Sequence, residues 1–347
     1  MKKRDIIDLI RYHAENNDIG FRNAAYKIAN EFDAAGDGQL AGYISSLLSN
    51  NSTFIPQNVE SKSAFFEKIE YNNEMLLLPD DILQDLYGVM NAVEHHIGIN
   101  KFLFQGAPGT GKTEAVKQLS KILNREVFMV NFTSIIDSKL GQTQKNMVSL
   151  FTEINNLYHP SKVLILFDEI DAIVLDRTND NDIREMGRTT SEFLKLLDKI
   201  NEDIVIVATT NLYKYLDKAI IRRFDSVIDF NRYSRDDLMD IAERMLDLYL
   251  HKLKLTNRDI RLFRKIINLA KTLPMPGDMK NIIKTSLAFS NVNDPNDYLV
   301  RLYANIHGEK PDDISLLKKQ GFTVREIEKL TNTSKSSVSR LLNKEAN

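Results

Sequence analysis

The hydrophobic positions in the first 50 residues recur at helical spacing. Ile6, Ile7 and Ile10 form one apolar face, and the stretches FRNAAYKIANEF and QLAGYISSLL repeat the pattern. The stretch SNNSTFIPQNVESKS that follows is polar and aperiodic. We therefore predict a small helical domain over residues 1–50 and a linker over residues 51–78. The domain is either a plain bundle or a docking module that contacts a partner.

A different pattern begins at Pro79, where short apolar runs alternate with helical stretches. The runs are KFLFQ, EVFMVN, VLILFD, IVIVAT and SVIDF, and the middle three have the unbroken character of strands buried on both faces. This alternation predicts an α/β fold over residues 79–230, with a parallel sheet sandwiched by helices. No further strand is predicted beyond it. Residues 231–308 are expected to form a helical domain, and residues 309–347 a small all-α segment.

Composition and charge narrow the classes of function. The 347 residues include 46 lysines and arginines against 48 aspartates and glutamates, and the net charge of −2 indicates neither a nucleic acid nor a membrane as partner. The absence of cysteine excludes disulfides and thiolate metal sites. The first residues lack the apolar region of a signal peptide, and no stretch is apolar enough to span a membrane. We expect a cytoplasmic protein.

The stretch GAPGTGKT at residues 106–113 matches the P-loop pattern G-x-x-x-x-G-K-[ST]. An expected strand precedes it and an expected helix follows it, which disfavours a glycine-rich turn by chance. The glycines allow backbone N–H groups to turn inward, and the helix N-terminus favours an anion. Lys112 is expected to reach the β- and γ-phosphates, and Thr113 to bind Mg²⁺. The expected phosphate site consists of Gly106, Ala107, Pro108, Gly109, Thr110, Gly111, Lys112 and Thr113.

Two later strand ends supply groups for hydrolysis. VLILFDEID places Asp168 and Glu169 at the end of a buried strand, where a carboxylate is costly unless it serves a cation. Asp168 is expected to hold Mg²⁺, and Glu169 to polarise the attacking water. Asp171 is interpreted as a structural acid. IVIVATTN ends at Asn211, which is either a turn residue or the amide that positions the water. Together these motifs predict hydrolysis of a nucleoside triphosphate.

Residues 79–230 resemble the AAA family within the AAA+ ATPases. The stretches GAPGTGKT, LILFDEID, ATTN and LDKAIIRRFDSVIDF carry the resemblance. The helical region at 231–290 resembles the AAA lid, and the chain is similar to bacterial single-module AAA ATPases. The resemblance implies a P-loop AAA+ sheet followed by a lid. It also implies ATP with Mg²⁺ as ligands and a homo-oligomeric ring, a hexamer.

The resemblance also gives a role to two adjacent arginines in DKAIIRRFDS. In the family, Arg222 and Arg223 correspond to residues that project into the nucleotide site of the neighbouring subunit. A guanidinium suits this task because it is planar, permanently charged and matched to phosphate oxygens. The alternative is a surface salt bridge with Asp225 or Asp229.

Two positions depart from the family pattern. Threading members carry an aromatic residue in a pore loop, where this chain has Lys139-Leu140-Gly141. The loop therefore grips polypeptide, favours acidic or nucleic-acid polymers, or binds no polymer. The lid lacks an obvious sensor arginine. Lys280 is either its substitute or a residue of a solvated helix face.

The segment 309–347 has the pattern of three short helices. Asp312 or Asp313 is expected to cap the first, Thr323 and Glu326 to form a capping box for the second, and Ser334 to cap the third. Asn332 suits a left-handed turn between the last two helices. A small shared core is expected from Val324, Ile327, Leu330, Val338, Leu341 and Leu342.

This segment resembles a helix-turn-helix module. Seven basic and two acidic residues between Ile314 and Lys344 give it a local charge of +5. Thr333 and Glu328 depart from the residue types usual in the motif. DNA binding and protein contact both remain open. The residues expected on the exposed face of the last helix are Lys335, Ser336, Ser337, Ser339 and Arg340.

Three hypotheses of function follow. The first is a ring ATPase that remodels an unidentified protein partner. The second is a DNA-associated ATPase switch of the kind used in transposition or defence, with DNA bound through residues 309–347. The third is a scaffold that regulates a partner protease or nuclease. The basic segment and the Lys139 loop favour the last two, whereas the intact hydrolytic set argues against an inactive scaffold.

Overall fold

The structure is a computed structural model. It describes residues 3–14, 18–34, 36–48, 63, 65–69, 76–136, 142–157, 159–173, 182–255, 257–291 and 294–345. The loop Lys139-Leu140-Gly141 lies outside the described residues. The chain divides into two units, Met1–Ser63 and Ala64–Asn347, and each is described by itself.

The N-terminal unit contains the helices that the sequence predicts. They are α1 (Lys3–Ala14), α2 (Asp18–Ala34) and α3 (Gly38–Leu48). Their buried side chains are small or aliphatic, and Ala29 is the most completely buried. The apolar face expected on α1 is exposed within this unit, because Ile7 and Ile10 are 63% and 62% accessible.

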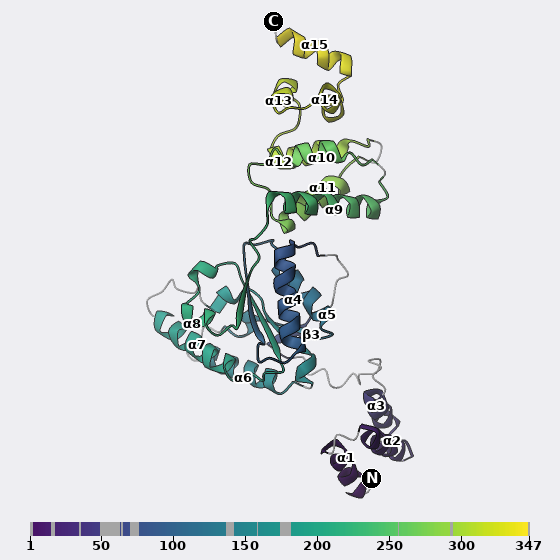
Figure 1. The fold of residues 1–347 in the computed structure, drawn as a ribbon, viewed down its shortest axis with the longest axis vertical. Coiled ribbons are helices and arrows are strands. Elements are labelled where there is room, and N and C mark those ends of the chain that lie inside the picture. Colours follow the sequence, from purple (N-terminus) through teal and green to yellow (C-terminus); the bar gives the residue numbers. More distant parts are fainter. Residues whose placement is uncertain are drawn as a thin grey trace. The chain divides into compact units, whose positions relative to one another are not determined.

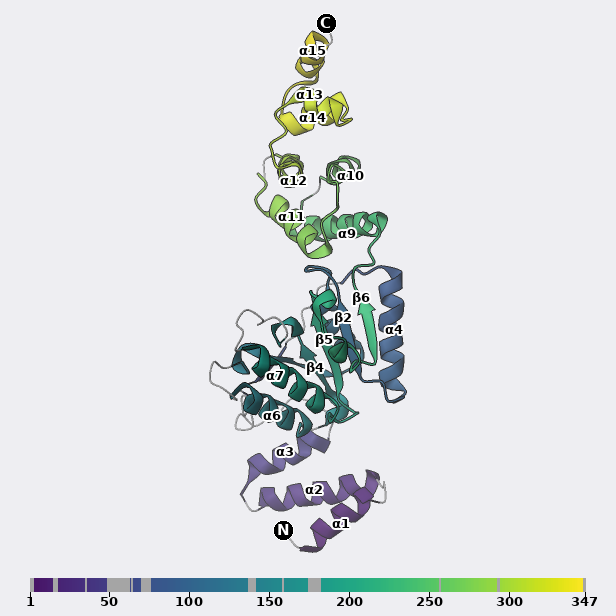
Figure 2. The same cartoon turned by 90° about the vertical axis from the view of Figure 1, so that its left-hand side faces the viewer.

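The larger unit is built on a six-stranded sheet, seen in Figures 1 and 2. Its order is β1-β3-β4-β5-β2-β6, in which β1 pairs antiparallel with β3 and the other pairings are parallel. All five predicted strands are present, which confirms the α/β fold. The strands are β1 (Phe66–Lys68), β2 (Lys101–Gln105), β3 (Glu126–Val130), β4 (Val163–Phe167), β5 (Val205–Thr210) and β6 (Ser226–Asp229).

Two details of the sheet differ from the sequence prediction. Strand β1 lies inside the predicted linker at 51–78, where three residues are too few to show a pattern. Strands β4 and β5 are buried throughout as expected, but β3 is only partly buried. β3 is less buried because of its position in the sheet, where one of its neighbours is the three-residue strand β1. Strand β2, by contrast, lies between β5 and β6.

Alternate residues of each strand face two separate apolar cores. On one face Phe167 packs against Phe151 and Phe193, and on the other Phe104 packs against Phe230. Figure 2 shows α6 and α7 together over one face, and Figure 1 shows α4 against the sheet. The helices and single turns of this layer are α4 (Asp80–Glu94), α5 (Lys112–Ile122), η1 (Phe132–Ser134), α6 (Gln142–Asn155), η2 (Pro160–Lys162), η3 (Ile170–Ile173), α7 (Asp182–Leu197), η4 (Tyr213–Tyr215) and α8 (Lys218–Ile221).

The described residues after β6 are helical, as the sequence predicts. A single apolar core extends from the predicted lid into the predicted C-terminal segment, so that Phe263 and Leu299 share a cluster with Ile327 and Val338. The boundary at 308/309 stays a prediction. The helices are α9 (Arg235–Leu253), α10 (Ile260–Ile267), α11 (Pro276–Ala288), α12 (Asp297–His307), α13 (Ile314–Lys319), α14 (Val324–Thr331) and α15 (Lys335–Glu345).

The ends of the last helices largely follow the expected capping pattern. Asp313, and not Asp312, caps α13 through hydrogen bonds that its Oδ1 accepts from two backbone N–H groups. Thr323 and Glu326 form the predicted capping box of α14, and Asn332 ends that helix with φ 52°. Leu341 does not join the core as expected, because its side chain is 46% accessible.

Among the described helices, none combines the length and the apolar character needed to cross a membrane.

Candidate active site

The P-loop occupies the turn between β2 and α5. Strand β2 ends at Gln105, and α5 begins at Lys112. Gly109 and Gly111 have φ values of 76° and 91°, a region that glycine adopts without a steric penalty. This backbone allows residues 106–111 to curve around the N-terminus of α5. The helix dipole and the first N–H groups of α5 therefore face the inside of the loop.

Lys112 extends across the loop and is only 7% accessible. Its Nζ donates hydrogen bonds to Gly106 O at 2.8 Å, Ala107 O at 2.9 Å and Asn211 Oδ1 at 2.8 Å. Burial lowers the pKa of Lys112, and the carboxylates of Asp168, Asp171 and Glu169 only partly offset that effect. The ammonium is thus held by neutral acceptors, which a phosphate oxygen can replace.

Asp168 meets two threonine hydroxyls. Its Oδ1 accepts hydrogen bonds from Thr113 Oγ1 at 3.0 Å and from Thr209 Oγ1 at 2.6 Å. A carboxylate and a hydroxyl from separate elements form a set of hard oxygen donors that suits Mg²⁺. The described residues contain no cluster of three or more His, Cys, Asp or Glu that could hold a metal. Mg²⁺ in phosphate sites is usually held by one or two protein oxygens, with phosphates and waters as its other ligands. Thr113 and Asp168 are the residues that would hold it.

Glu169 is exposed and has the left-handed backbone conformation, with φ 53°. A non-glycine residue in this region costs on the order of 1–3 kcal/mol and persists only where neighbours hold it. Here the Glu169 N–H donates to Thr209 Oγ1 at 2.9 Å, and Asn211 Nδ2 donates to Glu169 Oε1 at 3.3 Å. The turn after β4 therefore presents a carboxylate to the cavity.

Asn211 connects the Lys112 ammonium to the Glu169 carboxylate. Its Oδ1 accepts from Lys112 and its Nδ2 donates to Glu169, so one amide contacts both groups. The Asn211 backbone N–H donates to Asp171 Oδ2 at 2.9 Å, and Thr210 Oγ1 donates to the other oxygen of the same carboxylate. Asp171 is 6% accessible. It fixes the end of β5, which is the structural role expected for it.

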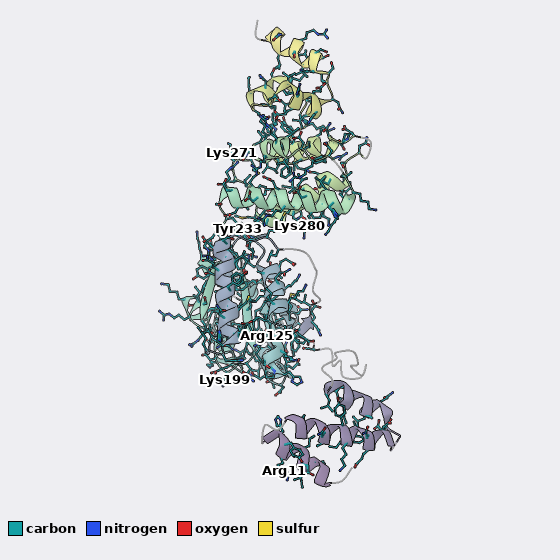
Figure 3. The ribbon with its side chains drawn as sticks, turned by 45° about the vertical axis from the view of Figure 1, so that its right-hand side comes forward. Arg11, Arg125, Lys199, Tyr233, Lys271 and Lys280 are labelled. Atoms are coloured by element: carbon teal, nitrogen blue, oxygen red, sulfur yellow. The ribbon has the colours of Figure 1, made fainter. Side chains whose placement is uncertain are left out.

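These groups open into a cavity of 330 Å³. The cavity has an apolar side that the sequence prediction did not include, because its residues come from the predicted linker and lid. They are Leu76, Leu77, Met245 and Pro276. Lys280 also lines the cavity and is half-buried, and Figure 3 shows it with Tyr233 where the sheet layer meets the following helices. No sequence periodicity indicates these positions.

Three hydrogen bonds join the P-loop to the chain beyond β6. Asn231 Oδ1 accepts from the Ala107 N–H, Tyr233 Oη donates to Thr110 O, and the Gly277 N–H donates to Gly109 O, each at 2.8 Å. Burial raises the pKa of the Tyr233 phenol, so this donor keeps its proton. A Cβ atom on Gly277 would lie 2.8 Å from Gly109 Cα, which explains why glycine is needed there. The sequence prediction missed all three contacts.

Arg222 and Arg223 lie at the other end of the sheet. The N–H of Asp225, just beyond them, donates to Lys101 O at the start of β2, whereas the P-loop follows the end of β2. A five-residue strand separates the two ends by roughly 16 Å. Neither arginine is among the described residues that line the cavity. The arginines are thus separated from the P-loop of their own chain.

The expected alternative, a surface salt bridge, occurs at Arg223 with a partner other than the examples Asp225 and Asp229. Asp225 accepts hydrogen bonds from two backbone N–H groups at the start of β2, and Asp229 accepts from the Asn231 N–H. Arg223 instead lies 3.4 Å from Asp198, with both side chains 45% accessible. An exposed pair of this kind contributes about 1 kcal/mol or less. Arg222 is exposed and lines a shallow groove next to Lys218.

A parallel sheet with a P-loop, a strand-end carboxylate pair and a strand-end amide defines a P-loop nucleoside triphosphatase. Comparison with known proteins narrows this class. Residues 102–232 match the sequence profile of the family described as "ATPase family associated with various cellular activities (AAA)". Over these residues the chain is similar to ATPase domains of the AAA family.

Three relatives illustrate the match. An uncharacterized AAA family ATPase of Sinorhizobium fredii is 30% identical over 183 residues, which cover 50% of this chain and 54% of the relative. A putative 26S proteasome regulatory subunit homolog of Methanothermobacter thermautotrophicus is 34% identical over 157 residues, or 44% and 40%. A proteasome-activating nucleotidase of Methanococcus maripaludis is 31% identical over 170 residues, or 47% and 40%. The chain spans about half the length of the curated relatives it matches, or less.

Proposed function

We propose that this chain binds ATP with Mg²⁺, hydrolyses it within a homo-oligomeric ring, and uses the cycle to remodel a protein partner. The observation that carries the proposal is the amide of Asn211, which contacts both the P-loop lysine and the exposed carboxylate of Glu169. A cavity with this arrangement can hold phosphate oxygens at one end and a water molecule at the other. The apolar residues from the lid offer a surface for the nucleobase.

The residues divide the hydrolytic work as follows. Backbone N–H groups of residues 109–113 and the Lys112 ammonium bind the phosphates. Thr113 and Asp168 would hold Mg²⁺, which would supply positive charge against the phosphate oxygens. Glu169 accepts a proton from the attacking water, and Asn211 orients that water while keeping Glu169 in place. Tyr233, Asn231 and Gly277 hold the loop backbone from the lid side.

Assembly into a ring is supported by the position of the arginines. Because Arg222 and Arg223 lie roughly a strand length from their own P-loop, their charge is available to a phosphate of another subunit. We propose a hexamer from the family resemblance. A protein as the remodelled partner is supported by the relatives named as a proteasome regulatory subunit homolog and a proteasome-activating nucleotidase.

The test of hydrolysis is the substitution Glu169→Gln in the full chain. We expect ATP binding to be kept and turnover to fall by on the order of 10²–10⁴, because the water loses its general base. Binding is measured by calorimetry and turnover by phosphate release. The control is Glu94→Gln at the exposed end of α4, which should leave both unchanged. Near-normal turnover of purified Glu169→Gln protein would remove Glu169 from the mechanism.

A second candidate function is an ATPase switch that binds duplex DNA. The observation that favours it is the exposed basic face of the last helices, where Arg325, Lys335 and Arg340 are accessible to solvent. Ser334 and Glu328 cap the N-terminus of α15 through its backbone N–H groups, so this end has a defined geometry. Short serine side chains beside Lys335 permit close approach to a phosphate.

The test of DNA binding is fluorescence anisotropy with labelled duplex over a range of salt concentrations. If three to five phosphates are contacted, log K should fall with log salt at a slope of about −3 to −4. Lys335→Ala/Arg340→Ala should weaken binding and flatten the slope, whereas Lys310→Ala, an exposed lysine outside these helices, should not. Equal binding by all three proteins, or none at low salt, would leave protein contact as the role of this segment.

A further inference from the structure

Two helices from different predicted domains, α10 and α14, are joined by two ion pairs. Asp259 caps α10, and its second oxygen accepts a hydrogen bond from Lys329 Nζ of α14 at 2.6 Å. Glu326 belongs to the capping box of α14, and its Oε2 accepts from Lys265 Nζ of α10 at 2.6 Å. Each helix therefore neutralises the carboxylate that caps the other. Such a reciprocal arrangement fixes both the register and the direction of the two helices.

The Lys265–Glu326 pair is partly buried, because the Glu326 side chain is 11% accessible and that of Lys265 is 32%. Glu326 is 8% accessible, and its Oε2 also accepts from the Thr323 N–H at 2.7 Å. Lys265 Nζ donates additionally to Gly321 O at 3.1 Å and lies 5.7 Å from the centre of the Phe322 ring. Removing one member of a buried pair leaves an uncompensated charge, which is strongly unfavourable. Separation of α14 from α10 is therefore costly.

Apolar packing reinforces the ion pairs. Helices α13, α14 and α15 have 6, 8 and 11 residues, lengths at which isolated helices are unstable in water. Phe322 and Ile327 are 1% and 0% accessible, and they belong to the same core as Phe263 of α10 and Tyr303 of α12. The Tyr303 hydroxyl donates to Gln320 Oε1 at 2.9 Å. Helices α13–α15, here called the tail, thus depend on the helices of the predicted lid for their burial.

The part of the chain beyond β6 also contacts the nucleotide site. Asn231 and Tyr233 precede α9, and Gly277 lies in the first turn of α11, which packs against α9. Their three hydrogen bonds engage Ala107, Thr110 and Gly109, so they hold most of the turn of the P-loop. Lys112 now donates to Gly106 O and Ala107 O, and it must exchange these acceptors when a phosphate enters. The carbonyls of residues 106 and 107 that Lys112 contacts therefore lie in the same loop that holds the lid.

We propose that α9–α15, the lid with the tail, form one cooperative body, tethered to the P-loop by Asn231, Tyr233 and Gly277, so that nucleotide binding is transmitted to the tail. The inference rests on the proposed function only in that ATP is the ligand of the cavity. It differs from an appended module in a measurable way. A module on a flexible connection opens and exchanges independently, whereas a cooperative body opens as a unit.

The first experiment is native-state hydrogen exchange on the full chain without nucleotide. We expect the amides of α10 and α14 to exchange with the same protection factor, because they open together. Exchange of the α14 amides that is faster by about tenfold or more overturns the single body. A chain ending at Gly308 is unsuitable for this purpose, because its removal of Phe322 and Ile327 would damage the lid core itself.

The second experiment repeats the measurement with Mg²⁺ and the non-hydrolysable analogue AMP-PNP at about one hundred times its Kd. Exchange in α5, α10 and α14 should slow by a common factor, up to about 100-fold. Slowing in α5 and α10 without α14 overturns transmission to the tail, and slowing in α5 alone overturns the tether. No change in α5 refutes ATP binding, while the nucleotide-free comparison still decides whether lid and tail are one body.

Substitutions test the ion pair directly. Lys265→Met should make α14 amides exchange about tenfold faster than those of α10. The matched control is Lys319→Met, at an exposed position of α13. If Lys265→Met protein does not fold, the double variant Lys265→Met/Glu326→Leu removes both charges, and such a replacement is often neutral. Recovery of equal protection in the double variant supports the pair. Identical exchange in Lys265→Met and Lys319→Met overturns it.

Discussion

Two lysines in different regions of this protein have the same chemistry and opposite surroundings. Lys112 in the nucleotide site is 7% accessible, and the acceptors found for it among the described residues are two carbonyls, a hydroxyl and an amide. Lys265 between lid and tail is more exposed, and its partner is the carboxylate of Glu326 at 2.6 Å. The buried cation has neutral partners, and the accessible one has an anion.

The difference separates a binding group from a structural one. A buried charge without a counter-charge is unfavourable, and such a group persists where a ligand supplies the missing charge. Burial lowers the pKa of Lys112, which is the signature of this unfavourable state. Glu326 shows the reverse, since burial alone raises its pKa but the hydrogen bonds from Lys265 and Thr323 outweigh that effect and lower it. Arg222, exposed at the far end of the sheet, extends the comparison to a cation whose anion is expected on another chain.

The largest predicted effect concerns that expectation. Arg222→Ala/Arg223→Ala and Lys112→Ala should each lose ATPase activity by on the order of 10³–10⁵, as for loss of an arginine finger. Mixing the two inactive proteins should restore part of the activity, because some interfaces then join an intact P-loop to intact arginines. Phosphate release across a series of mixing ratios measures this. If no ratio restores hydrolysis, the assignment of the arginines to a neighbouring site loses its support.

A second prediction compares the two lysines. Lys112→Met should abolish ATP binding yet leave the free energy of unfolding unchanged or higher, because nearby carboxylates only partly offset the burial of the cation that is removed. Lys265→Met should keep ATP binding measurable but lower the stability of the lid by about 1–3 kcal/mol. Urea unfolding and calorimetric titration separate the two outcomes. Loss of stability in Lys112→Met would contradict the distinction drawn here.

A third prediction uses acid. Burial alone raises the pKa of Asp259, but the hydrogen bonds from Lys329 and the Leu262 N–H, with the nearby charge of Arg261, lower it below its ordinary 3.8. The pKa of Glu326 is likewise held below 4.5. A carboxylate with a lowered pKa stabilises the folded state above its ordinary value and loses that contribution as pH falls through the lowered one. Protection of α14 should therefore decline below about pH 4. The control is Glu326→Gln, whose protection should start lower and depend less on pH in that range.

A fourth and smaller effect is expected at the tether. Tyr233→Phe removes the hydroxyl that donates to Thr110 O but keeps the ring, so the cost should be about 1 kcal/mol. We expect weaker nucleotide affinity, by about fivefold, and a smaller effect of nucleotide on exchange in α14 than in α5. Tyr215→Phe, on a 67% accessible side chain, is the control. Unchanged affinity and unchanged transmission in Tyr233→Phe would assign the hydroxyl no part in the coupling.

The features that sequence predicted correctly are those set by local pattern. GAPGTGKT between a strand and a helix, and unbroken apolar runs such as VLILF, indicate their structures within a few residues. The capping box of Thr323 and Glu326 is local in the same way. Each of these depends on neighbours along the chain, and the five parallel strands follow from them.

The features that sequence missed depend on residues far apart in the chain. Strand β1 exists because Phe66 pairs with Val130, and its three residues carry no periodicity of their own. Tyr233 contacts a loop 123 residues earlier, which no spacing rule indicates. Leu341 looked like a core residue, yet burial of its helix uses Val338. The two ion pairs between α10 and α14 were also missed, because their partners lie 61 and 70 residues apart in the chain.

The contact between Gly277 and Gly109 leaves no space for a side chain at position 277. The Gly277 N–H reaches Gly109 O at 2.8 Å because Gly277 has no side chain, and a methyl group there would overlap the Gly109 backbone. A methyl group at position 277 would thus push the lid away from the P-loop. The side chains of the site would stay chemically intact, and these are Lys112, Asp168, Glu169 and Asn211. Gly277→Ala would give a protein with complete catalytic chemistry and a disturbed contact between the lid and the P-loop, which makes it a reagent for separating that contact from the hydrolytic step.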